Sequence, residues 1–94
     1  MTDRELINLA AKAIGYWDYE FNCYKGPLSF DPLTDDGDAL RLAVKLNLLV
    51  DVSGADTTAT NGAGVDENEL HNGDPYAATR RAIVRAAAAI GKAA

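Results

Sequence analysis

The chain has 94 residues, 48% of them apolar, which suffices for one folded domain and argues against global disorder. Nine basic and fourteen acidic residues give a formal charge of −5, which disfavours extensive contact with nucleic acid or an anionic membrane. Cys23 is the single cysteine and cannot form an internal disulfide, and no apolar stretch reaches the roughly 20 residues of a membrane helix. Since residues 1–5 also lack the pattern of a signal peptide, we expect a single cytoplasmic domain over residues 1–94.

The first third of the chain changes from a helical to a strand pattern. Thr2 and Glu5 fit a capping box, apolar residues then recur at helical spacing, and Gly15 is a suitable stop, which predicts a helix over about residues 3–14. Residues 16–24 alternate with a period of two and are rich in aromatic side chains, which predicts a strand, and residues 28–30 could return as a short one. The alternation places four side chains on one side, facing the core: Trp17, Tyr19, Phe21 and Cys23.

The middle of the chain predicts a capped helix followed by an apolar strand. Asp31-Pro32 forms a turn, Thr34 or Asp35 can cap the helix, and the helix is expected over about residues 35–46. Several carboxylates then lie near the positive end of the helix dipole: Asp35, Asp36 and Asp38. Its buried side is predicted to consist of apolar residues: Ala39, Leu40, Leu42, Ala43 and Leu46. Residues 48–52 are nearly all apolar, as expected of a central strand.

Residues 53–73 are loosely specified. Residues 57–60 have strand propensity, Asn61-Gly62 favours a tight turn, and residues 63–65 could return as a weak partner strand. The acidic residues 66–69 indicate a solvated segment. The strand at 57–60 is expected to leave an unprotected edge, through which the chain could self-associate.

The last segment predicts a third helix. Asp74 suits the N-cap and Pro75 the first helical position, so we expect a helix over about residues 75–92, with Tyr76 in its apolar stripe. Three amphipathic helices and the strands between them favour an α/β fold. We expect a three-layer α/β/α sandwich around one small mixed or antiparallel sheet, with a two-layer α+β arrangement as the alternative.

Three segments resemble a family of small proteins of tailed bacteriophages and prophages. They are DPLTDDGDALRLAVKL at 31–46, DPYAATRRAIVRAAAAIG at 74–91, and the opening MTDREL with LAAKA at 9–13. The sequence is similar there to the phage "ABA sandwich" domain and, more distantly, to NinX-type phage proteins. The resemblance implies the three-layer fold and a location in the cytoplasm of the bacterial host. It implies no activity and no functional residues.

No constellation in the sequence predicts chemistry. Cys23 could act as a nucleophile only with His71, the single histidine, and is better explained as a small core residue. His71 is expected on a surface loop, without the further ligands that zinc needs. The spacing of the cluster Asp31, Asp35, Asp36 and Asp38 fits no calcium loop and is better explained by helix capping and compensation of the helix dipole. We therefore expect no catalytic, metal or cofactor site and no enzymatic activity.

The remaining candidates are surfaces for a partner. Arg81 and Arg85 are one helical turn apart on one face, and Tyr19 and Tyr24 are aromatic residues that an open sheet edge would expose. We expect a non-catalytic phage or prophage accessory protein that binds a host or phage protein. The alternative is a small nucleic-acid-binding module that uses the basic face of the last helix.

Overall fold

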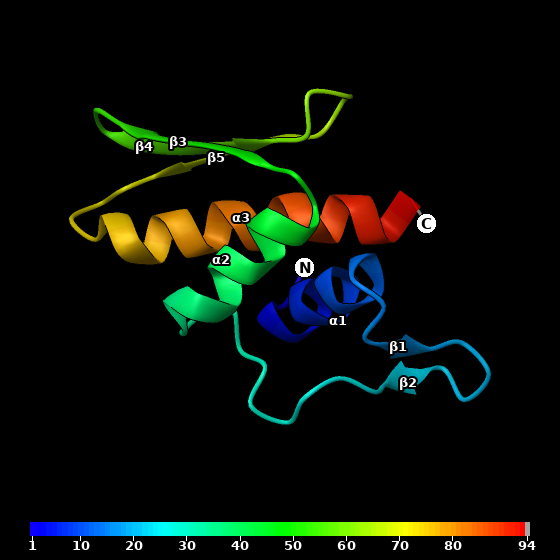
Figure 1. Cartoon of the computed structure of the whole chain (residues 1–94). Coiled ribbons are helices and arrows are strands. Elements are labelled where there is room, and N and C mark those ends of the chain that lie inside the picture. The colour runs from blue at the N-terminus through cyan, green and yellow to red at the C-terminus, as the bar shows by residue number, and fades with distance from the viewer. Residues whose placement is uncertain (94) are drawn as a thin grey trace.

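The computed structural model describes residues 1–93 and contains three helices and two antiparallel sheets (Figure 1). The helices are α1 (Asp3–Ala13), α2 (Asp36–Lys45) and α3 (Pro75–Ala93). The strands are β1 (Trp17–Asp18), β2 (Cys23–Tyr24), β3 (Leu49–Ser53), β4 (Asp56–Thr60) and β5 (Asp66–Leu70). The predicted small α/β sandwich is confirmed in its α+β form, and each helix ends within one residue of its predicted bounds.

The long helix α3 forms the middle layer. The three-stranded sheet β3-β4-β5 lies along one side of α3, α1 packs on the opposite side, and α2 crosses it (Figure 1). The residues that α3 buries are mostly small and surround the helix: Ala78, Ala82, Ile83, Val84, Ala86, Ala87, Ala88 and Gly91. The expected order of layers, with the sheet in the middle, is therefore replaced by one with α3 in the middle.

Only one face of the three-stranded sheet is covered by a helix. The rows Val50–Ala59–Glu67 and Val52–Thr57–Glu69 face α3, and Thr57 and Ala59 are fully buried there. The opposite face consists mainly of polar residues, for example the row Asp51–Thr58–Asn68. Such a face gains nothing from apolar cover, and no helix within residues 1–93 lies on it.

The helix ends follow the sequence signals. Thr2 and Glu5 form the predicted capping box on α1, and the Asp35 side chain accepts a hydrogen bond from the N–H of Asp38 at 2.8 Å, which makes Asp35 the cap of α2. Asn47 adopts the predicted left-handed conformation after α2, with a φ of 53°. Asp74 accepts from the N–H of Ala77 at 3.0 Å, and α3 begins at Pro75 as predicted.

The predicted strand over residues 16–24 is wrong. The chain forms instead a separate hairpin of two two-residue strands, which projects from the body of the molecule (Figure 1). The Asp18 carboxylate accepts from the N–H groups of Glu20 and Phe21 and so closes a turn, with Asn22 in the left-handed region. Three residues expected in the core are consequently exposed: Tyr19, Phe21 and Cys23. Residues 28–30 form no strand.

The roles predicted for the later strands are also corrected. The strand at 56–60, β4, is central rather than the unprotected edge that the sequence predicts, whereas β3, expected to be central because it is apolar, is an edge strand. The acidic residues 66–69 belong to β5 rather than to a solvated segment, and residues 63–65 lie in the β4–β5 loop. Low strand propensity is overcome here because Glu67 and Glu69 face α3 and meet an arginine there.

No helix within residues 1–93 is long and apolar enough to cross a membrane.

We expect Gly91→Ala to destabilise the protein. A Cβ at Gly91 would lie 2.8 Å from the carbonyl carbon of Leu9 and 3.2 Å from the nitrogen of Ala13, both in the backbone of α1. Backbone atoms cannot move aside cheaply, so we expect a loss of roughly 1–3 kcal/mol in the free energy of unfolding, measured by urea denaturation.

Gly37→Ala is the matched control, because Gly37 also lies in a helix. The atoms nearest to a Cβ there are the ends of the flexible Arg41 and Asp35 side chains, at 3.2 Å. Alanine favours the helix by up to about 1 kcal/mol, so Gly37→Ala should be neutral or stabilising. Equal losses in both variants would contradict the close α1–α3 contact.

We expect Asp38→Asn to weaken stability at neutral but not at strongly acidic pH. Burial raises the pKa of the Asp38 carboxyl, but hydrogen bonds from the Asp31 N–H at 2.9 Å and from Arg41 at 2.8 Å lower it below its ordinary value overall. The stabilisation is therefore present above the unfolded pKa, near 3.8, and is lost as the pH falls through the lower folded pKa.

The measurement is the free energy of unfolding of both proteins between pH 7 and pH 2. The difference should be about 1–2 kcal/mol at pH 7 and shrink towards zero in acid. Asp66→Asn, which changes an exposed carboxylate, should stay within about 0.5 kcal/mol throughout. If the difference in the free energy of unfolding between wild type and Asp38→Asn does not change with pH, the ionised Asp38 carboxylate is not the source of the stabilisation.

Candidate functional site

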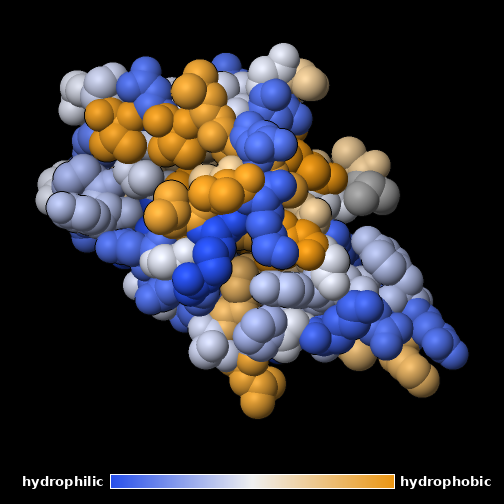
Figure 2. Space-filling model, in the orientation of Figure 1, coloured by the Kyte–Doolittle hydropathy of each residue, from blue (hydrophilic) through white to orange (hydrophobic). Residues whose placement is uncertain are grey.

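An open groove of about 510 Å³ lies between α2, β3 and α3. Its walls are mainly apolar and come from all three elements: Ala39, Leu40, Ala43, Val50, Val52 and Ile83. Figure 2 shows apolar surface gathered over β3 and α2 on this side of the molecule. We refer to this feature as the α2–β3–α3 groove.

Three large side chains of the groove are exposed to solvent. Leu40 of α2 is 62% exposed, Val52 of β3 is 51% exposed, and Tyr76 of α3 is 70% exposed. Single exposed apolar residues are common, but these three line the same depression. A contiguous apolar patch of this kind is typical of a site that binds another molecule.

The charged groups of the groove, Arg80 and Asp36, are already paired within the protein. The Arg80 guanidinium donates from Nε to the Leu33 carbonyl at 2.8 Å and from Nη1 to Asp36 at 2.7 Å. These bonds hold the start of α2 against α3. Because the Arg80 guanidinium is engaged in these bonds, a ligand would contact mainly the apolar walls of the groove.

A buried hydroxyl network supports the wall from behind. The Thr57 hydroxyl is hydrogen-bonded to the Thr79 hydroxyl and to His71 Nε2, both at 2.9 Å, and Thr57 is fully buried. His71 lies in the loop after β5, as predicted, but it is half-buried rather than on the surface and ties the end of β5 to β4. Since Thr57 is inaccessible, this network serves packing rather than nucleophilic chemistry.

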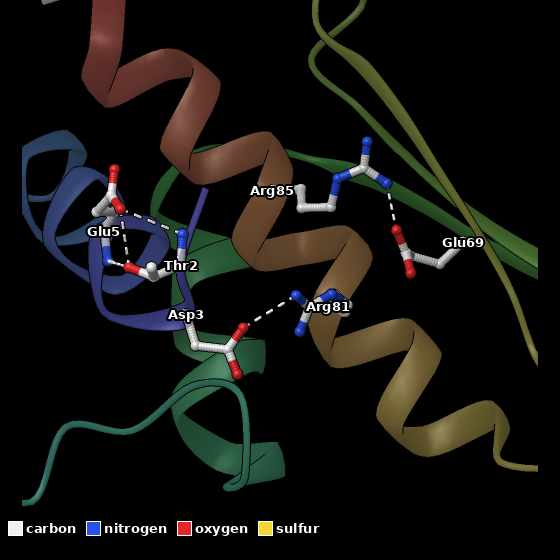
Figure 3. Close-up of polar contacts among 6 residues, drawn as sticks. All are labelled: Thr2, Asp3, Glu5, Glu69, Arg81 and Arg85. Carbon is white, nitrogen blue, oxygen red and sulfur yellow. Dashed lines mark hydrogen bonds and ion pairs between the residues drawn. The ribbon is translucent and has the colours of Figure 1, made fainter.

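Arg81 and Arg85 lie together in a second groove, between α1, β5 and α3. Arg81 pairs with Asp3 at 2.9 Å (Figure 3). Arg85 pairs with Glu69 and with Glu67, the latter at 3.1 Å, and donates to the Asn68 carbonyl at 3.1 Å. The predicted shared face is present, but both guanidinium groups are occupied by carboxylates of the chain itself.

The two candidate tyrosines have different roles. Tyr19 is 65% exposed in the turn of the β1–β2 hairpin. Tyr24 packs edge-on against Tyr16 and stacks on Phe30, with ring centroids 6.3 and 6.2 Å away, and its hydroxyl donates to the Pro27 carbonyl. Burial foremost, and then Tyr16 and Asp38, raise the pKa of Tyr24 above its ordinary value. The four candidate residues therefore do not form one surface.

The residues weighed for chemistry lie apart. Cys23 is exposed on β2, His71 follows β5, and Asp35 and Asp38 are engaged at the start of α2. Within residues 1–93, no three His, Cys, Asp or Glu side chains are grouped in a way that could hold a metal ion.

The groove could not be predicted from the sequence, because its exposed residues have the spacing of core residues. Leu40 and Tyr76 lie on predicted buried helical stripes, and the structure exposes both. One signal was present: Leu40 and Val44 are apolar, one turn apart, and widen the apolar side of α2 beyond what its contact with α3 buries.

Comparisons of the chain with protein-family models, with curated proteins and with solved structures find no match in any of the three. The resemblance to phage proteins therefore stays a prediction.

We expect Arg85→Gln to destabilise the protein. The change leaves Glu67 and Glu69, whose side chains are 25% and 22% exposed, without their cation. Because the cluster is partly open to solvent, we expect a loss of roughly 1–2 kcal/mol in the free energy of unfolding, smaller at high salt.

Arg4→Gln is the control, since Arg4 is exposed and forms no ion pair with the described residues. It should change the free energy of unfolding by less than about 0.5 kcal/mol. If urea denaturation shows no difference between the two variants, Arg85 does not hold β5 to α3.

Proposed function

We propose that the protein is a non-catalytic protein-binding module and that the α2–β3–α3 groove is its binding surface. The observation that carries the proposal is the exposure of Leu40, Val52 and Tyr76 in one apolar depression. The centres of protein–protein interfaces are apolar, poor in charged residues and rich in tyrosine. The groove has this composition, with its one arginine already paired.

The setting that we propose follows from the resemblance to phage proteins. In that setting the chain is an accessory protein of a phage or prophage, which binds a host or phage protein in the bacterial cytoplasm. The alternative of a nucleic-acid-binding module draws no support from α3. Its guanidinium groups at Arg81 and Arg85 would have to leave Asp3, Glu67 and Glu69 before they could contact phosphates.

The test is capture of a partner from nuclease-treated lysate of the bacterial host with tagged wild-type protein and with Leu40→Gln. Glutamine suits a helix about as well as leucine does, so α2 should stay folded. Loss of a buried leucine contact of about 2 kcal/mol should weaken binding roughly tenfold or more, measured by titration of the captured protein.

Leu28→Gln is the matched control. Leu28 is also exposed, at 102%, but lies outside the groove, so this variant should bind like the wild type. Equal binding by all three proteins, or no nuclease-resistant partner, would contradict the proposal.

A further inference from the structure

We propose that the groove accepts an extended, basic segment of the partner protein, which adds to the three-stranded sheet as a new strand beside β3. The inference rests on the proposed function and specifies its partner. Four features of β3 and its surroundings lead to it.

The first feature is the direction of the backbone groups of β3. The two-residue loop Gly54-Ala55, with Gly54 at a φ of 63°, is closed by the pair Ser53–Asp56, which makes that pair hydrogen-bonded. Hydrogen-bonded pairs alternate, so Leu49, Asp51 and Ser53 bond to β4. The N–H and C=O groups of Val50 and Val52 then point away from β4, along the open edge of the sheet.

The pattern on the other side of β4 agrees with this assignment. The Ala55 carbonyl accepts from the His71 N–H at 2.9 Å, and the Asn61 N–H donates to the Val65 carbonyl at 3.2 Å. Odd-numbered residues of β4 thus bond towards β5, and even-numbered residues bond towards β3. The outward backbone groups of Val50 and Val52, which lie opposite Ala59 and Thr57, have no partner strand within residues 1–93.

The second feature is the difference between the two edges of the sheet. On β5 the Asn68 carbonyl is occupied by Arg85, and the inward side chains are the charged Glu67 and Glu69. Inward charges and covered backbone groups are the usual protection of an edge strand. On β3 the corresponding inward residues are valines, so this edge has no such protection.

The third feature is where the side chains of an added strand would lie. Neighbouring strands are about 4.8 Å apart, and side chains that lie opposite each other point to the same face. Side chains opposite Val50 and Val52 would therefore enter the α2–β3–α3 groove beside Leu40 and Tyr76. Alternate apolar residues of the segment would fill the groove, and the residues between them would face solvent.

The fourth feature is charge. Asp51 faces solvent at the middle of β3 and forms no ion pair with residues 1–93, so an opposite charge on the added strand would form a cross-strand pair. The net charge of −5 also favours a basic partner. A second copy fits less well, because pairing β3 over its whole length with itself would place Asp51 opposite Asp51 of the other copy.

The experiment uses the whole chain and a synthetic peptide probe, a valine/lysine peptide with the sequence Val-Lys-Val-Lys-Val and blocked ends. Binding is followed by the NMR shifts and hydrogen exchange of the backbone amides. We expect saturable binding that protects the amides of Val50 and Val52. The same peptide with glutamate in place of lysine should bind at least tenfold more weakly.

Val52→Pro removes the outward N–H and is compatible with an edge strand, so the fold should persist while peptide binding falls at least tenfold. Val52→Ala is the matched control, since it shortens the side chain but keeps the N–H, and it should bind more tightly than Val52→Pro. If Val52→Pro fails to fold, the wild-type protein with a peptide N-methylated at its valines tests the same bonds and should show the same loss.

The inference is overturned if neither peptide binds at millimolar concentration, if the two charges bind equally, or if proline and alanine at residue 52 bind alike. A dimer that sedimentation detects and Val52→Pro abolishes would make a second copy the occupant and would also overturn it. In the capture experiment, one result is that Leu40→Gln loses the partner while Val52→Pro still binds it. That result overturns the added-strand inference but leaves the proposed function standing. A partner kept by both variants overturns the proposed function as well.

Discussion

The close contact between α1 and α3 determines the arrangement of the rest of the molecule. At Gly91 the two backbones approach until no side chain fits between them, and alanines such as Ala10 and Ala87 are fully buried in the layers around it. With α1 occupying one side of α3, the sheet and α2 must cover the others. The helix α3 thus packs against α1, α2 and the sheet at once. No helix within residues 1–93 remains to cover the outer face of the sheet or the open edge of β3.

The helices could be predicted from the sequence because their signals are local. The capping box at Thr2 and Glu5, the cap at Asp35 and the proline at residue 75 each act within one turn of the backbone. The strands could not, because their positions depend on distant partners. Glu67 and Glu69 belong to a strand since Arg85 on another element neutralises them, and the local sequence contains no sign of that contact.

The candidate site was missed for a related reason. Helical periodicity shows that Leu40 and Tyr76 lie on apolar stripes, but it cannot show which neighbouring element covers a stripe. In the same way, the apolar composition of β3 suggested a central strand, whereas the fold places it at an edge. Leu40, Tyr76 and Val52 of β3 are apolar, as a core requires. They stay exposed because no further helix or strand of the described chain covers them.

The ion pairs of α3 connect the shape of the protein to the charge of its surface. Arg80, Arg81 and Arg85 each pair with a carboxylate from another part of the chain, so these three cations of the helix hold α2, α1 and β5 in place. The carboxylates on the outer face of the sheet, Asp51, Asp56 and Asp66, form no ion pair with the described residues. Stabilisation of the fold therefore leaves negative charge beside the unprotected strand, and both features of β3 favour a basic, extended partner.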